Sequence, residues 1–117
     1  MIRTIEIDGK PVSFRVSAAV PRIYRMQCGR DIFRDMEKVA QEMRESDEGD
    51  TPLGAETLTT FENLAYAMAY AADPAHVPES AEAWLDQFAA LPIRMIFPKI
   101  ELLWLQNLAQ LNEPAKK

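Results

Sequence analysis

The chain has 117 residues, 48% of them apolar and 26% charged, a balance typical of one folded domain. Its 13 basic and 18 acidic side chains give a net charge of -5, which disfavours nucleic acid as a partner. No uncharged stretch reaches the roughly 20 apolar residues of a membrane span, and no signal peptide is visible. We therefore expect a cytoplasmic protein that binds neither nucleic acid nor membrane.

The N-terminal residues predict a β-hairpin over 1–16. Asp8-Gly9 tolerates the positive φ angles of a tight turn, and the runs on either side of it alternate between polar and apolar residues. Alternation places the apolar side chains on one face, which helices must cover. These side chains are Ile5, Ile7, Val12, Phe14 and Val16.

Two helices are predicted next. Ser17 is expected to cap a short helix that ends at Cys28, and Gly29 suits the left-handed residue that closes it. Cys28, the only cysteine, is expected to be a small buried hydrophobe. A second, amphipathic helix follows, and residues 46–54 are expected to form an exposed connection. The core stripe of this helix is Ile32, Phe33, Met36, Val39, Ala40 and Met43.

The rest of the chain is expected to be helical. A third helix ends at Asp73-Pro74, a fourth runs from a Ser80 cap to near Pro92, and a last one spans 93–112 with a restart or bend at Pro98. The core stripe of the third helix is Leu58, Phe61, Leu64, Ala65, Met68 and Ala72. The predicted class is α+β, mainly α: a hairpin (1–16) and four or five helices (17–112) in one domain, with a flexible tail at 113–117.

No arrangement of residues suggests catalysis. His76 is the only histidine and is expected to be an exposed loop residue, and one histidine with one cysteine cannot hold structural zinc. The four glycines lack the spacing of a phosphate-binding loop. Asp47, Glu48 and Asp50 are expected to form a solvated acidic turn. We therefore predict a protein that is not an enzyme and has no catalytic residue, no metal site and no cofactor.

Two helices carry apolar residues outside their core stripes. On a helical projection Tyr66 and Tyr70 lie opposite the stripe of the third helix, and Met95, Leu102 and Leu105 lie away from that of the last. Either these helices are enclosed by neighbours, or the five residues form a partner-binding surface. The role of a group of arginines has two interpretations as well: they form either a docking patch or a solvated face. These arginines are Arg15, Arg22, Arg25, Arg30 and Arg34.

Five strings in order along the chain resemble the tail assembly chaperones of long-tailed phages and prophages of Gram-positive bacteria. They follow the N-terminal hairpin and precede a short tail that ends in lysine, so the likeness covers nearly the whole chain. No single string is diagnostic by itself. The strings are SAAVPRIYR at 17–25, GRDIF at 29–33, FENLAY at 61–66, AWLDQF at 83–88 and FPKIELLW at 97–104.

The resemblance implies a protein of the host cytoplasm, absent from the finished virion. It would coat the tape-measure protein, keep it soluble and help to recruit the tail-tube protein. Such proteins are often made in two lengths by ribosomal frameshifting, and Lys116-Lys117 is compatible with a slippery sequence. The second apolar faces leave self-association along the tape open. The alternatives are another small phage structural adaptor and a helix-turn-helix regulator.

Overall fold

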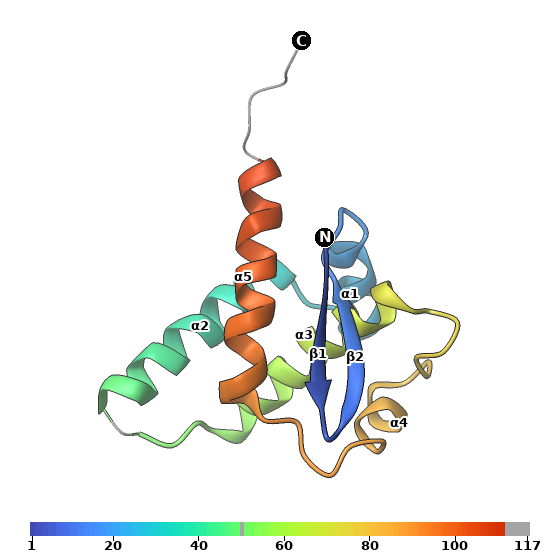
Figure 1. Cartoon of the computed structure of the whole chain (residues 1–117). Coiled ribbons are helices and arrows are strands. Elements are labelled where there is room, and N and C mark those ends of the chain that lie inside the picture. Colours follow the sequence, from blue (N-terminus) through green and yellow to red (C-terminus); the bar gives the residue numbers. More distant parts are fainter. Residues whose placement is uncertain (50, 112–117) are drawn as a thin grey trace.

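The computed structural model describes residues 1–49 and 51–111, and Figure 1 shows a β-hairpin set against a group of helices. The strands are β1 (Ile2–Ile7) and β2 (Lys10–Arg15), and the helices are α1 (Val20–Cys28), α2 (Ile32–Gly49), α3 (Ala55–Ala72), α4 (Ala81–Leu85) and α5 (Ile93–Leu111). The predicted class, α+β with mainly helix, is confirmed. The predicted tail at 113–117 lies outside the described residues.

The hairpin forms where the sequence predicts it. β1 and β2 pair antiparallel, and the turn places Asp8 at φ 57° and Gly9 at φ 75°. Two successive positive φ angles belong to the type I′ turn, whose twist matches that of the paired strands. Ile5, Ile7 and Phe14 are buried, and β2 packs against α3. One face of the hairpin is therefore part of the core.

Helix α1 ends as predicted but begins later. Gly29 closes it in the left-handed conformation at φ 69°. Ser17 is not its cap, because the helix begins at Val20 and the Ser17 hydroxyl accepts the backbone N–H of Ala19 at 3.3 Å. The serine thus closes a turn ahead of the helix. Pro21 lies in the first turn, where its missing N–H costs nothing.

Helix α2 continues to Gly49, so the predicted start of the connection at residue 46 is wrong. Ser46 is buried, and its hydroxyl donates to the carbonyl of Thr51. Arg94 at the start of α5 donates to Ser46 and to the carboxylate of Asp47. Polar contacts therefore hold the last turn of α2. The spacing of apolar residues along the sequence cannot reveal such contacts.

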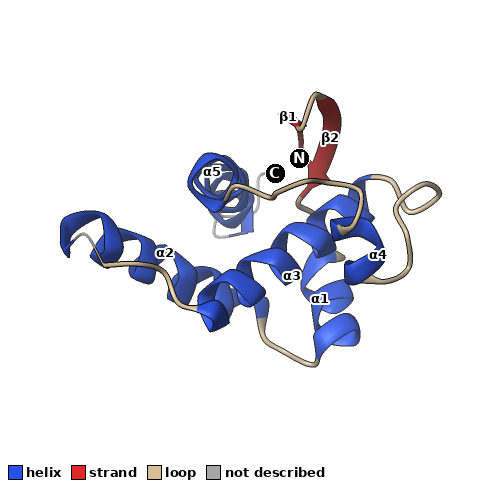
Figure 2. Cartoon of the chain, turned by 90° about the horizontal axis from the view of Figure 1, so that it is seen from below, coloured by secondary structure: helices blue, strands red, loops and turns tan. Residues whose placement is uncertain are grey.

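Helix α3 lies in the middle of the helices, as Figure 2 shows, and contacts β2, α1, α2, α4 and α5. Residues 64–69 are all buried, which explains why this helix is apolar all round. Leu58 is exposed, so its predicted place in the core is wrong. Thr57 and Thr60 take the buried positions of the first turns instead, and the Thr57 hydroxyl donates to the carboxylate of Glu42.

Helix α4 begins where predicted but is short. The Ser80 hydroxyl accepts the N–H of Ala83 at 3.1 Å, as a cap does. The helix ends at Leu85, so its predicted continuation to near Pro92 is wrong. The tip of the hairpin binds the backbone that follows: Asp8 accepts the N–H of Ala89, and Lys10 donates to the carbonyl of Gln87. These contacts hold the segment in turns.

Helix α5 is one continuous helix through Pro98, so the predicted restart there is wrong, while the alternative, a bend at Pro98, stays a prediction. Proline cannot donate to the carbonyl four residues earlier, which belongs to Arg94. Pro98 and Arg94 are both exposed, so the missing hydrogen bond lies on the solvent side of the helix. Ile96 and Ile100 are buried on either side of the proline and keep both parts of the helix on the same core.

Candidate functional site

A groove lies between α2 and α5. It has a volume of about 410 Å³. Its floor is buried and apolar, its walls are exposed and apolar, and three charged side chains lie at its edge. We call it the α2/α5 groove, and its lining residues are Phe33, Met36, Glu37, Ala40, Arg44, Glu101, Trp104, Leu105 and Leu108.

The two helices run in opposite directions along the groove. The start of α5 is fixed to the end of α2 by the bonds from Arg94 to Asp47 and Ser46. Near the start of α2, the ring of Phe33 meets that of Trp104 edge to face, with centroids 5.2 Å apart. Ala40 lies between these two contacts, and its small side chain leaves space that a larger residue would fill.

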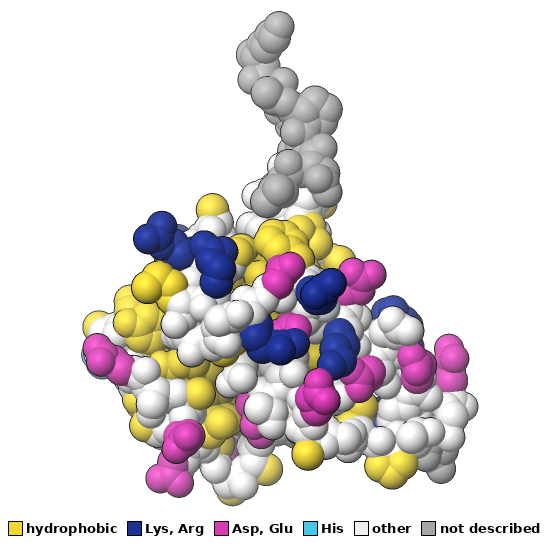
Figure 3. Space-filling model, turned by 180° about the vertical axis from the view of Figure 1, so that it is seen from behind, with side chains coloured by type: hydrophobic (Ala, Val, Ile, Leu, Met, Phe, Trp, Pro, Cys, Tyr) yellow, Lys and Arg dark blue, Asp and Glu magenta, His cyan; other side chains and the backbone are white. Residues whose placement is uncertain are grey.

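The surface of the groove is mainly aromatic and aliphatic. Phe33 is 45% exposed and Leu105 is 51% exposed, whereas Trp104 is buried except for a small part of its surface. Figure 3 shows hydrophobic side chains gathered at the base of the projecting end of α5. Exposed apolar surface with aromatic content and a charged edge is typical of protein-binding sites. The chemistry of the groove is therefore apolar recognition.

Sequence reasoning missed Phe33 because it placed this residue in the core stripe of α2. Consecutive helical positions are about 100° apart, so Ile32 and Phe33 cannot both lie at the centre of one stripe. Ile32 takes the buried position. Phe33 lies on the same side of α2 as Glu37 and Arg44. These charged neighbours were the signal in the sequence that Phe33 lies at the surface.

The three predicted site residues on α5 lie at its surface. Met95, Leu102 and Leu105 are 40%, 48% and 51% exposed. The opposite face of the helix is buried, so the prediction that α5 has a second apolar face is confirmed. The binding of a partner to these residues stays a prediction. The buried residues of α5 are Ile93, Ile96, Phe97, Ile100, Leu103 and Trp104.

The predicted place of Tyr66 on a partner-binding surface is wrong. It is buried, its hydroxyl donates to the carbonyl of Pro78 at 2.5 Å, and its ring lies 5.9 Å from that of Trp84. Burial also raises the pKa of Tyr66 above its ordinary value. Helix α4 and the segment before it cover this face of α3, so the enclosed interpretation holds there. Tyr70 is half-buried and lies against Tyr66.

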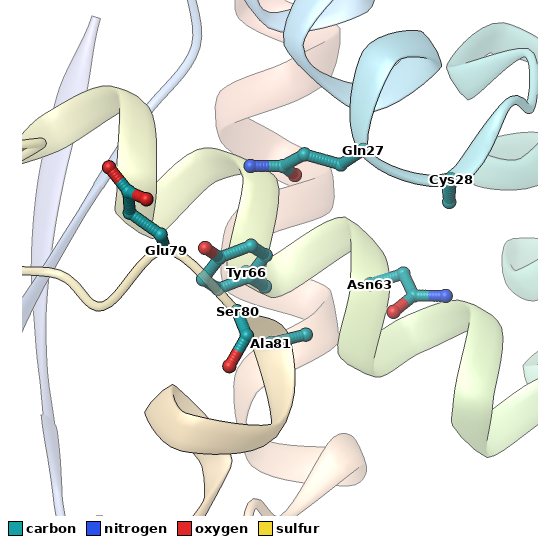
Figure 4. A pocket seen from close by; sticks show the side chains of 7 residues that line it. All are labelled: Gln27, Cys28, Asn63, Tyr66, Glu79, Ser80 and Ala81. Carbon is teal, nitrogen blue, oxygen red and sulfur yellow. The ribbon is translucent and has the colours of Figure 1, made fainter.

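A second hollow, of about 270 Å³, lies between α1, α3 and the start of α4, as Figure 4 shows. Three polar groups at its wall already have partners: Tyr66 bonds Pro78, Ser80 caps α4, and the thiol of Cys28 donates to the carbonyl of Tyr24. Cys28 is half-buried, not buried as predicted. This hollow lacks a paired acid and base, so no chemistry follows from it.

A buried carboxylate fixes the start of α2, from which Phe33 projects. Asp35 is almost fully buried; it accepts the Tyr24 hydroxyl at 2.6 Å and two bonds from Arg30, at 2.7 and 2.9 Å. Burial alone raises the pKa of Asp35, but the bonds from Arg30 and Tyr24 outweigh burial and hold this pKa below its ordinary value. Burial and the bond to Asp35 raise the pKa of Tyr24.

Other kinds of site find little support in the described residues. No three His, Cys, Asp or Glu side chains within residues 1–49 and 51–111 are placed to hold a metal ion. His76 is exposed and pairs with Asp73 at 2.9 Å, as expected for a loop residue. None of the helices over that part of the chain is both long and apolar enough to cross a bilayer.

Comparisons with known proteins do not add an assignment. No protein-family model matches the chain, and neither a curated protein nor a solved structure is significantly similar to it. The geometry of the α2/α5 groove is therefore the main evidence on function.

Proposed function

We propose that this protein is a phage tail assembly chaperone, which binds helical segments of a tape-measure protein in the α2/α5 groove and keeps them soluble. One observation carries the proposal: an apolar groove with a buried tryptophan floor and exposed walls runs between two helices. The resemblance of the sequence to such chaperones names the partner. Recruitment of the tail-tube protein, a place in the host cytoplasm and absence from the virion belong to the same proposal.

The dimensions of the groove suit an amphipathic helix. Phe33 and Arg44, at its two ends, are eleven residues apart on α2, or about 16 Å at 1.5 Å per residue. Three turns of a bound helix cover the same length and present apolar residues at positions i, i+3 or i+4, and i+7. Phe33 and Leu105 would then flank the bound stripe while Trp104 lies beneath it.

The groove also suits a contact that must be released. Only two of its large apolar side chains, Phe33 and Leu105, are strongly exposed, so one groove offers few anchors. A tape-measure chain presents many similar helical turns, and several chaperones bound side by side would hold it through multivalency. Each contact can then stay weak enough for the tail-tube protein to displace it.

Co-expression tests the proposal. A helical segment of the tape-measure protein encoded near this chain is expected to stay soluble and to co-purify with the wild-type protein. Phe33→Asp places a charge in the wall of the groove and is expected to abolish co-purification. Met26→Asp is the matched control, because Met26 is 74% exposed on α1 and does not line the groove.

Two results would contradict the proposal. One is equal capture by Phe33→Asp and Met26→Asp, which would separate the groove from binding. The other is recovery of the protein from mature virions, which would indicate a structural adaptor instead. A gene order without a tail-tube gene and a very long helical gene nearby would remove the proposed partner.

A further inference from the structure

Helix α5 carries a row of exposed apolar residues that follows the coiled-coil rule. Their spacing alternates between three and four residues, which is the spacing of positions a and d in a heptad repeat. All five lie at the surface. We call this row the α5 seam, and its residues are Met95, Pro98, Leu102, Leu105 and Ala109.

The second half of α5 is poorly suited to stand alone in water. Residues 102–111, LLWLQNLAQL, contain no charged side chain. Figure 1 shows the end of this half projecting beyond the hairpin and the other helices. A projecting helix without charge, with leucines on its open side, loses free energy when a second apolar helix covers it.

We propose that two copies of this chain pair through the α5 seam, with their α5 helices antiparallel. Leu102 of each copy packs against Leu105 of the other, and Pro98 packs against Ala109. The projecting half of each helix then lies over the anchored half of the other, and the two bodies stand at opposite ends of the pair. This inference does not rest on the proposed chaperone function, but Leu105 belongs to both the α5 seam and the α2/α5 groove, so a second copy and a bound helix would compete for it.

Charges beside the seam disfavour a parallel pair, even though Arg94 also pairs with Asp47 of its own chain. In heptad terms Arg94 occupies a g position and Lys99 the e position five residues later. A parallel in-register pair places these g and e side chains of opposite helices next to each other. Two like-charged contacts would form, one on each side of the pair, and both would oppose association.

The same charges select the antiparallel register. If Pro98 faced Leu102, Lys99 would lie opposite Lys99 and Glu101 opposite Glu101 of the second copy. A shift by one heptad brings the two leucines of the seam together. It also places Lys99 opposite Gln106 and Glu101 opposite Leu108, so no like charges meet. Only the shifted register joins the largest seam side chains without repulsion.

Sedimentation velocity tests the pairing. The wild-type protein is expected to shift from monomer to dimer as its concentration rises. Leu102→Asp places a carboxylate in the seam but outside the groove, and is expected to raise the dissociation constant at least about tenfold. Phe33→Asp, which changes the groove but not the seam, is expected to leave the dimer intact. Leu102→Asp should keep the wild-type thermal midpoint, whereas Phe33→Asp should lower it by a few degrees, because it loses the ring contact with Trp104.

The outcomes separate this inference from the proposed function. A wild-type protein that stays monomeric at high concentration, or a Leu102→Asp variant that dimerises like the wild type, would overturn the pairing. Loss of helix capture in Phe33→Asp with an intact dimer would leave it standing. Loss of the dimer in Phe33→Asp would move the interface to the groove and also overturn it.

Cross-linking tests the direction. In a Cys28→Ala background, Pro98→Cys and Ala109→Cys proteins are prepared separately, oxidised alone and then oxidised as a mixture. A disulfide is expected only in the mixture, because residues 98 and 109 of one helix are about 16 Å apart, beyond the reach of a disulfide between identical positions. A disulfide between two Pro98→Cys chains would show a parallel pair and refute the register.

Discussion

Replacing Asp35 by alanine removes the carboxylate that ties α1 to α2. The side chain of Asp35 is buried, whereas that of Arg30 is 49% exposed. In the variant, the Tyr24 hydroxyl stays buried without its acceptor, and Arg30 returns to solvent. The change therefore loses one buried bond completely and one bidentate ion pair that water partly screens.

The size of the stability loss in Asp35→Ala follows from this difference in exposure between Asp35 and Arg30. Removing one partner of a fully buried ion pair costs about 3–5 kcal/mol. Because Arg30 is half exposed, we expect the lower end, a loss of about 3 kcal/mol in the free energy of unfolding. For a domain of this size about 4 °C corresponds to 1 kcal/mol, so the thermal midpoint should fall by roughly 12 °C.

Urea unfolding followed by circular dichroism measures this loss at pH 7, with Glu48→Ala on the exposed side of α2 as control. The pKa of Asp35 is lowered in the folded state, so its contribution is present above the unfolded value near 3.9 and is lost as the pH falls through the folded pKa. Below about pH 4 the stability difference between the wild type and Asp35→Ala should begin to shrink, and it should continue to shrink as the pH falls through the folded pKa. A loss of less than about 0.5 kcal/mol in the free energy of unfolding at pH 7, or a difference from the wild type that acid does not reduce, would refute the reasoning.

Three further predictions follow from the packing. Tyr66→Asp buries a charge among aromatic rings and should leave little folded protein by circular dichroism, whereas Tyr66→Phe, which loses one bond, should cost about 1 kcal/mol in urea unfolding. Ala40→Leu fills the α2/α5 groove and should weaken capture of a tape-measure helix about tenfold in a titration, with a wild-type melting curve. Gly29→Ala places a Cβ at φ 69° and should cost about 1 kcal/mol, measured the same way.

The sequence predicted those parts of the fold that depend on local patterns. Asp8-Gly9 indicated the turn, Gly29 the end of α1, and Asp73-Pro74 the end of α3. Each rests on a backbone preference that one or two residues carry by themselves. The apolar period of α5 likewise separated its buried face from its exposed one.

The errors fall where contacts between distant segments decide the outcome. Arg94 holds the last turn of α2, and Asp8 and Lys10 hold the turns that follow α4. Tyr66 was placed on a surface because a helical projection shows that a second face is apolar, but not which element covers it. A projection could not distinguish the covered face of α3 from the open face of α5.

The candidate site was predicted in part for the same reason. Leu105 was found from its position outside the core stripe of α5. Phe33 and Trp104 were assigned to core stripes, and only the antiparallel placement of α2 and α5 brings them together at a groove. A groove between two helices needs both helices, so one periodic pattern cannot reveal it.

Trp104 offers the most direct test of the central claim, that the α2/α5 groove binds an amphipathic helix. It lies at the floor of the groove, and Trp84, the other tryptophan, is buried elsewhere. Because Trp104 is already largely buried, titration with a helical tape-measure peptide should give a small change in tryptophan emission that saturates, and Phe33→Asp should abolish the change. An unchanged emission in the wild type, or an equal change in Phe33→Asp, would contradict the account.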